Sequence, residues 1–231
     1  MRILSPFLAI AAAAAAIFLA LAATPDAHGQ DSSIDRLIKK LPPPEKVVQA
    51  DAAAQDPLAR RIVEAIKASN FGNAYEMSQK LAVRYPKSAE AQSVHGQLAL
   101  ALHHYPQAAN AFQKTVSIQP GNAFAYVGLA LSEAAQNHVS AAMSNFRRVT
   151  RLDPKADAGW IGLSACAEKL GRRGESLDYA RRATAVAPSS FAAWLQLARA
   201  EGISGHRQAS ANALARANEI RRKTTNANRH S

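Results

Sequence analysis

The chain reads AFAYVGLALSEAAQNHVSAAMSNFRRVTRLDPKA from residue 123 to 156 and DAGWIGLSACAEKLGRRGESLDYARRATAVAPSS from residue 157 to 190. Placed one above the other, the two stretches pair similar residues at the same positions. Tyr126 pairs with Trp160, Leu129 with Leu163, and Ala142 with Ser176. Similarity at a fixed period of this length is the signature of a repeat protein, in which each unit completes the core of its neighbour. We therefore predict an array of stacked repeats.

The same period extends in both directions from this pair. Four prolines lie 34 residues apart, namely Pro86, Pro120, Pro154 and Pro188. They set the register of five blocks, 55–88, 89–122, 123–156, 157–190 and 191–224. Small residues recur at the eighth position of a block, as Gly96, Ala130, Ser164 and Ala198, and at the twentieth, as Ala74, Ala108, Ala142, Ser176 and Ser210.

These columns resemble the tetratricopeptide repeat, which has aromatic, Leu-Gly/Ala, Ala, Phe and Pro positions. The resemblance covers about 170 of the 231 residues,. It implies an all-α fold, a right-handed superhelical array of antiparallel helix pairs with about five repeats. The first and last blocks depart from the pattern, with Leu58 in place of the aromatic residue and Arg222 in place of proline. Atypical end units are expected because they cap the array, and block 191–224 is interpreted as the cap.

The two small columns have a physical reason. The eighth position lies on the first helix of a repeat and the twentieth on the second, so small side chains there let the two helices approach closely. A larger side chain would overpack the contact, at a cost of about 1–3 kcal/mol. Gly171 and Gly205 fall in the turns between helices, where a positive φ is often required,. A helical bundle without repeats would not require this period.

The segments outside the array predict an exported protein. Residues 3–23 are uncharged and apolar and follow Arg2, which indicates a signal peptide over residues 1–23, with cleavage as far as residue 29 as a second option,. The alternative is an uncleaved anchor of the inner membrane, because this segment is long enough to span a bilayer. Residues 24–54 are interpreted as a proline-containing tether with a short helix, and residues 225–231 as a basic tail,. The expected location is the periplasm.

Composition and motifs argue against an enzyme. A single cysteine, Cys166, excludes a disulfide framework and a cysteine-rich zinc site,. The seven histidines show no metal-binding spacing and are interpreted as solvated loop residues,. No phosphate-binding loop or nucleophile elbow occurs. We therefore expect no catalytic residue, no metal and no cofactor.

The resemblance also implies where a partner binds. Tetratricopeptide arrays bind extended peptides or helices along a concave face lined by the first helix of each repeat. Carried onto this chain, the predicted groove residues are Gln97, Leu100, Phe124, Val127, Leu131, Ile161, Ala165, Lys169, Leu195 and Arg199. Most of the central ones are apolar, which favours an apolar or amphipathic partner segment. The alternative is that some of them pack against neighbouring helices or the tether.

Charge is unevenly distributed along the chain. Residues 147–231 hold 16 Lys and Arg against 7 Asp and Glu, whereas residues 24–146 hold 11 and 10. The predicted basic surface comprises Arg148, Arg182, Arg216, Arg221, Arg222 and Lys223. Such a surface keeps a protein soluble or attracts an acidic protein, an anionic envelope polymer or a membrane surface. Nucleic acid is disfavoured, because export removes the chain from the cytoplasm and aromatic residues are few.

The sequence thus supports two hypotheses. The first is a non-enzymatic protein-interaction scaffold of the cell envelope that binds a protein or peptide segment in its groove. The alternative is a binder of an anionic polymer, an acidic protein or a membrane surface through the basic C-terminal half. Binding of the second kind weakens steeply with salt, whereas binding of an apolar segment does not.

Overall fold

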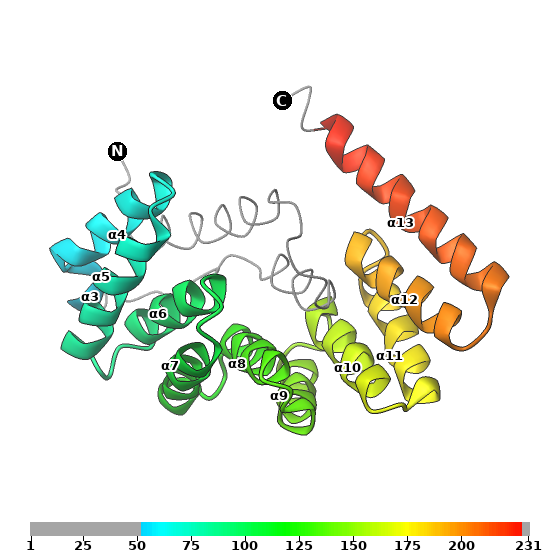
Figure 1. Ribbon diagram of the computed structural model, residues 1–231, viewed down its shortest axis with the longest axis horizontal. Coiled ribbons are helices and arrows are strands. Elements are labelled where there is room, and N and C mark those ends of the chain that lie inside the picture. The colour runs from blue at the N-terminus through cyan, green and yellow to red at the C-terminus, as the bar shows by residue number, and fades with distance from the viewer. Residues whose placement is uncertain (1–51, 228–231) are drawn as a thin grey trace. The chain divides into compact units, whose positions relative to one another are not determined.

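The computed structural model describes residues 52–227, and all regular secondary structure in this range is α-helical (Figure 1). Side chains are described as far as residue 223. The predicted signal peptide, nearly all of the tether and the last residues of the basic tail lie outside the described residues. The chain divides into two compact units at the turn between Asn137 and His138, inside the third sequence block.

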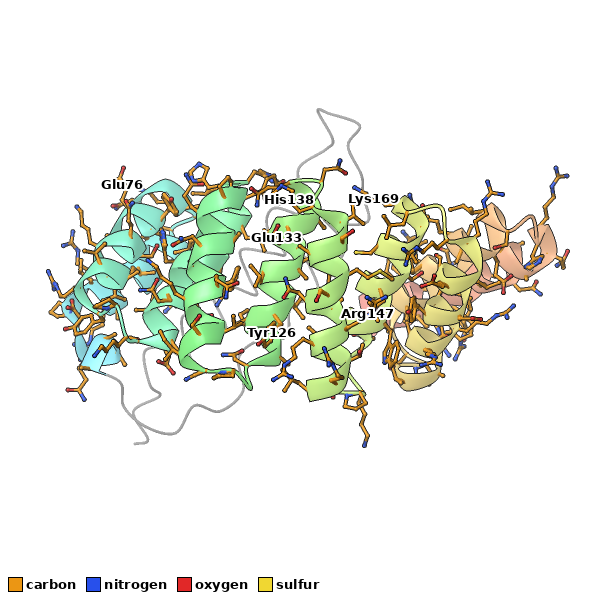
Figure 2. All side chains as sticks on the ribbon, turned by 90° about the horizontal axis from the view of Figure 1, so that it is seen from below. Glu76, Tyr126, Glu133, His138, Arg147 and Lys169 are labelled. Carbon is orange, nitrogen blue, oxygen red and sulfur yellow. The ribbon has the colours of Figure 1, made fainter. Side chains whose placement is uncertain are left out.

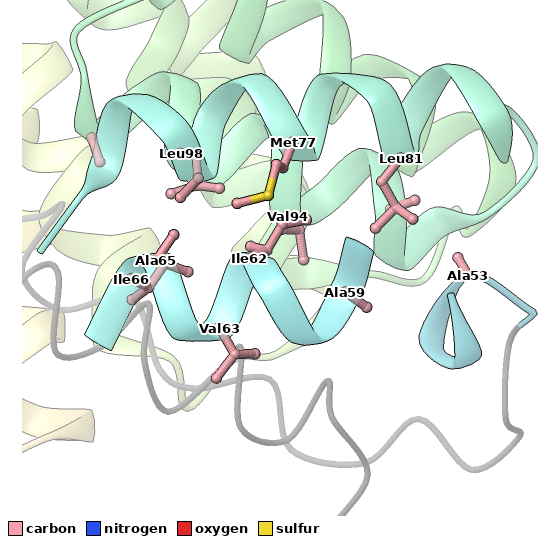
Figure 3. Close-up of a cluster of buried hydrophobic side chains, with 13 residues drawn as sticks. Ala53, Ala59, Ile62, Val63, Ala65, Ile66, Met77, Leu81, Val94 and Leu98 are labelled. Carbon is pink, nitrogen blue, oxygen red and sulfur yellow. The ribbon is translucent and has the colours of Figure 1, made fainter. Parts of the chain in front are cut away.

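The first unit contains six described helices. They are α3 (Ala52–Gln55), α4 (Pro57–Lys67), α5 (Phe71–Arg84), α6 (Ala89–Ala101), α7 (Tyr105–Ile118) and α8 (Ala123–Ala135). From α4 to α8 each helix packs against the next one in the chain, and α6 also contacts α8. Ile62, Met77 and Leu98 meet between α4, α5 and α6 and form part of a buried apolar cluster (Figure 3).

The second unit contains the other five described helices. They are α9 (Val139–Leu152), α10 (Asp157–Lys169), α11 (Arg173–Val186), α12 (Phe191–Ile203) and α13 (Arg207–Ala227). Successive helices again pack together, α10 also contacts α12, and α12 lies between α11 and α13 (Figure 1). Leu177, Leu197 and Ala213 join α11, α12 and α13 in one buried cluster. The predicted all-α solenoid of antiparallel helix pairs is confirmed.

Helix ends follow the same period as the core. Ser88, Asn122 and Ser190 precede first helices, and each side chain accepts a hydrogen bond from the backbone amide three residues later. Such N-caps satisfy an amide that has no partner within the helix, and each contributes about 1 kcal/mol. Three of the sequence blocks therefore begin directly after an N-cap residue.

The turns inside the helix pairs share one backbone conformation. Gly171 and Gly205 have positive φ values of 72° and 83°, as the sequence predicts. At the same position in the three earlier blocks Ser69, His103 and Asn137 also have positive φ. A non-glycine residue adopts this conformation at some energetic cost, so its recurrence at one position of the block marks a turn geometry that every repeat shares,.

In the last two repeats the small columns make the predicted contact, and the contact includes hydrogen bonds. The Ser164 hydroxyl on α10 donates to the carbonyl of Ser176 on α11 over 2.8 Å. The Ser210 hydroxyl on α13 likewise donates to the carbonyl of Ala198 on α12 over 2.7 Å. Only helices in close contact allow a hydroxyl to reach the neighbouring backbone.

A second set of close contacts joins consecutive repeats. Phe112 on α7 and Phe146 on α9 are fully buried, and each ring lies against a glycine of the following first helix, Gly128 on α8 and Gly162 on α10. A Cβ atom at either glycine would overlap three carbons of the ring. These two glycines are therefore required by the phenylalanine column, a pairing that the sequence analysis did not identify.

Candidate functional site

The predicted groove residues of the first unit are mostly buried. Gln97 and Leu100 on α6 are 6% and 0% exposed, and Val127 and Leu131 on α8 are 4% and 0% exposed. Phe124, at the start of α8, is half-buried and makes an edge contact with the Phe112 ring. In this unit only Phe124 is open to solvent among the predicted groove residues.

The second unit leaves more of its predicted groove residues accessible. Ile161 on α10 is buried, but Ala165 on α10 and Leu195 on α12 are half-buried. Lys169, at the C-terminal end of α10 (Figure 2), and Arg199 on α12 are exposed. Leu100, Val127, Leu131 and Ile161 of the predicted groove are thus buried in the structure, and their contact with a partner stays a prediction. Burial removes their apolar area from water, and a ligand must displace the atoms that shield them to reach them.

One of the accessible groove residues, Arg199 on α12, forms an ion pair with Glu168 on α10. The Nη2 and Nε atoms of Arg199 donate to Glu168 Oε1 over 2.7 and 2.8 Å. The other carboxylate oxygen, Glu168 Oε2, is buried and has no hydrogen-bond partner among the described residues. A buried acceptor without a donor is unfavourable by about 1–3 kcal/mol, so a ligand that displaces the atoms covering Oε2 and brings a donor would be favoured,. We call Ala165, Glu168, Lys169, Leu195 and Arg199 the α10–α12 face.

Sequence reasoning missed Glu168 although a signal was present. It lies three residues after Ala165 and seven after Ile161, a spacing that places all three side chains on one face of a helix,. The predicted groove includes the charged residues Lys169 and Arg199 but omits Glu168. The partner of Arg199 lies in the preceding block and is visible only once the repeats are stacked.

A buried polar network also joins the repeats of the second unit. Gln196 Nε2 on α12 donates to Ser164 Oγ on α10 over 3.0 Å, and Ser164 in turn bonds to Ser176 on α11. All three side chains are less than 9% exposed. The sequence analysis interpreted Ser164 as a small packing residue only, and the network explains why a hydroxyl is placed there. It is internal, so it supports the site without forming part of it.

A buried carboxylate joins α11, α12 and the turn before α13. Glu201 accepts from Arg181 Nη2 over 3.0 Å and lies 2.6 Å from His206 Nδ1. Burial alone would raise the pKa of the Glu201 carboxyl, but the bonds with His206 and Arg181 outweigh it, and the pKa lies below its ordinary value of 4.5. This group is fully partnered and is structural.

The predicted basic residues differ in their surroundings. The Arg182 guanidinium stacks over the Trp160 ring at 5.2 Å, and Arg221 lies 5.9 Å from the centre of the Phe191 ring. Arg216 and Lys223 both pair with Glu219, and their hydrogen bonds lower the pKa of that carboxyl to about 2. Arg148 is half-buried and the others are exposed. Part of the charge expected to attract a partner is thus compensated within the protein.

Cys166 and His95 carry side chains of reactive types, but their surroundings keep both in the neutral form. Burial raises the pKa of the Cys166 thiol to about 12, so the nucleophilic thiolate does not form near neutral pH,. His95 is half-buried on α6, stacks on the Tyr75 ring and lies 3.1 Å from Ser78 Oγ. Burial, with the charges of Lys114 and His104, lowers its pKa to about 4. The interpretation of the histidines as solvated loop residues is therefore wrong for His95.

Neither a cluster of metal ligands nor a helix suited to spanning a bilayer occurs in the described part of the chain. No group of three or more His, Cys, Asp or Glu residues there is arranged to hold a metal ion. Within residues 52–227, no helix combines the length and the apolar character that crossing a bilayer requires.

Comparison with known proteins shows similarity in structure but not in sequence. The sequence matches no family model, and no curated protein matches it. Among solved structures, one of MamA aligns with a TM-score of 0.63 at 16% identity, over 71% of this chain and 96% of that one. MamA 41-end from Desulfovibrio magneticus RS-1 gives 0.65 at 13% identity, over 75% and 97%.

A third similar structure is of a protein that is described by the name of its repeat. YrrB, described as a TPR protein with an unusual peptide-binding site, aligns with a TM-score of 0.56 at 16% identity. The alignment covers 74% of this chain and 93% of YrrB. At such identities the likeness establishes the fold. It agrees with the 34-residue columns of the sequence and the helix pairs of both units, and the chain has the fold of the tetratricopeptide repeat proteins.

Proposed function

We propose that the protein is a non-enzymatic interaction scaffold of the cell envelope that binds an amphipathic segment of a partner protein. The observation that carries the proposal is the buried, donor-free Glu168 Oε2 beside accessible apolar groups on the α10–α12 face. A peptide could pack an apolar side chain on Ala165 and Leu195 and donate an N–H group to Glu168. This combination of apolar contact and a few placed polar groups is what a recognition site requires. YrrB, of the same fold, is described as having a peptide-binding site, which supports the class of ligand.

The predicted location belongs to this proposal. The apolar residues 3–23 support export to the periplasm, with retention as an inner-membrane anchor as the alternative,. The intact mass of the protein isolated from the periplasmic fraction tests it. We expect a mass that lacks the residues before a cleavage point near residue 23, whereas a full-length mass in the membrane fraction would support the anchor.

Replacing Leu195 by glutamate should abolish capture of the partner. The change places a charge at the centre of the apolar part of the α10–α12 face, where the proposed ligand would have to desolvate it. The measurement is a cross-linked pull-down from envelope extract with identification of the bound protein. We expect capture by the unchanged protein and at least a tenfold loss, on the order of 1.4 kcal/mol, in the Leu195→Glu variant.

Leu170→Glu is the matched control. Leu170 follows the last residue of α10 and is 37% exposed, so the same substitution there adds the same charge outside the face. Both variants should keep the helical circular dichroism of the unchanged protein. Equal capture by the Leu195→Glu variant would contradict the proposal. A steep loss of capture with salt in all three proteins would instead support binding of an anionic partner through the basic surface.

A further inference from the structure

The last helix exposes Ala211 and Leu214, whose counterparts in α9 and α11 are buried. Arg207, Ala211, Leu214, Asn218 and Arg222 follow one another on α13 at intervals of three or four residues, which places them on one side of the helix,. Leu214 is 45% exposed, and the other four are exposed except for Asn218, which is half-buried. The inner side of α13 is a different one, marked by Ala213 and Ala217, which are 3% and 0% exposed. We call the five residues the α13 end face.

The second helices of the two preceding repeats, α9 and α11, show what packs against the corresponding face. In α9 the corresponding residues Met143 and Phe146 are 2% and 1% exposed, and Phe146 packs on Gly162 of α10. In α11 the corresponding Leu177, Ala180 and Thr184 are all less than 9% exposed, and α12 packs against that helix. At both junctions the first helix of the following repeat covers the face. The centre of the α13 end face, around Leu214, therefore corresponds to a surface on which a helix packs at the earlier junctions.

The size of the residue that fits opposite Leu214 follows from the earlier junctions. Phe112 and Phe146 face glycines, whereas Ala180 stands in the same column and is followed by Gln196 in the glycine column. A large residue in the phenylalanine column thus pairs with a small residue in the glycine column, and a small residue there pairs with a larger one, as close packing demands. Leu214 is intermediate in size, and its complement is a small side chain such as alanine.

The charges of the α13 end face indicate which kind of helix would bind to it. Arg207 and Arg222 lie at the two ends of the end face, and no described carboxylate lies within ion-pair distance of either. Glu219 is occupied by Arg216 and Lys223, on another side of α13. A second copy of the chain would bring the same positive charges to the contact and would be repelled. An acidic helix is attracted by them and can form charge-assisted hydrogen bonds with the guanidinium groups.

We propose that the α13 end face binds an acidic amphipathic helix of a partner protein. The helix would carry a small residue opposite Leu214 and carboxylates toward Arg207 and Arg222, and it would take the place that a first helix takes at each junction within the chain. This goes beyond the proposed function, because it uses another helix and another class of contact than the α10–α12 face. The two surfaces could be occupied at the same time by different segments.

The test uses a synthetic helical peptide with alanines along one face and glutamates along both edges of that face. Its binding to the full chain is measured by fluorescence anisotropy at fixed ionic strength. We expect the Leu214→Glu variant to bind about tenfold more weakly, a change that corresponds to 1.4 kcal/mol. Ala209→Glu is the matched control, since Ala209 is exposed on α13 outside the end face and the added charge is the same. It should bind as the unchanged protein does.

Other occupants give different results. Equal weakening in both variants would mean that the peptide responds only to net charge, and the proposal would be wrong. Binding of phosphatidylglycerol vesicles or polyphosphate with no difference between the two variants, together with no binding of the peptide, would point to a membrane or a polymer and also overturn it. Concentration-dependent dimerisation that Leu214→Glu abolishes would assign the face to a second copy. The Leu195→Glu variant should bind the peptide normally, so failure of one proposal leaves the other intact.

Discussion

Replacing Gly162 by alanine should destabilise the protein by about 1–3 kcal/mol or more, although alanine normally favours a helix over glycine. The added methyl group would overlap the ring of Phe146, which is 1% exposed. Either the ring leaves its preferred rotamer or α10 moves away from α9, and both cost packing energy. The free energy of unfolding from urea denaturation, followed by circular dichroism, measures the loss.

Gly174→Ala is the control for this prediction. Gly174 lies in the first turn of α11, and nothing lies within 4 Å of the position that its Cβ would occupy. The same substitution there should leave stability unchanged or raise it by up to about 1 kcal/mol, since it only reduces backbone entropy in the unfolded state. Losses of equal size at the two glycines would contradict the explanation by the phenylalanine contact.

A double variant tests the contact directly. Phe146→Leu removes the outer part of the ring, so Gly162→Ala should cost less in that background than in the unchanged protein. The interaction energy from the resulting cycle should be of the order of 1 kcal/mol, as for other residues in contact. Strictly additive losses would mean that the two side chains do not meet.

Replacing Asp56 by alanine should cost about 2 kcal/mol near neutral pH, the upper end of the range for an N-cap. Asp56 precedes α4, is 5% exposed, and accepts the Leu58 amide over 2.8 Å. Its second oxygen accepts from Arg84 over 2.7 Å and from the Tyr85 hydroxyl over 3.1 Å, which ties the start of α4 to the end of α5. Loss of the carboxylate removes all three of these hydrogen bonds.

The effect of Asp56 should also depend on pH. Burial by itself would raise the pKa of this carboxyl, but the bonds from Leu58, Arg84 and Tyr85 outweigh it, and the pKa lies below 3.8. A lowered carboxyl pKa stabilises the fold above the unfolded value and ceases to do so as the pH falls through the folded value.

The pH dependence is measured against Asp56→Asn. This variant keeps a capping oxygen and removes the charge, so it should be less destabilised than Asp56→Ala at neutral pH. Its difference in unfolding free energy from the unchanged protein should shrink as the pH falls below 3.8. Glu201, whose pKa is lowered in the same direction, is present in all these proteins and cancels in the comparison. A gap that is constant with pH would show that the charge of Asp56 contributes nothing.

Local patterns were sufficient to place most of the backbone. The proline spacing and the glycines at 171 and 205 act within a few residues of the chain, so the sequence alone predicts the helix boundaries and turns that they determine. The sequence predicted only part of the candidate site. The predicted groove named Ala165, Lys169, Leu195 and Arg199 of the α10–α12 face but included Leu100 and Leu131, which are buried, and omitted Glu168.

The 34-residue period in residues 55–224 was enough to establish helix pairs, their order and their close contacts, because those properties depend on residues near one another in the chain. Which side chains lie open, which carboxylate meets which guanidinium, and which glycine lies against a phenylalanine depend on contacts between repeats. Such contacts join residues from separate blocks, as between Ser164 and Gln196. The same residue column is buried in α9 and α11 and exposed in α13, since burial depends on whether another helix packs against it.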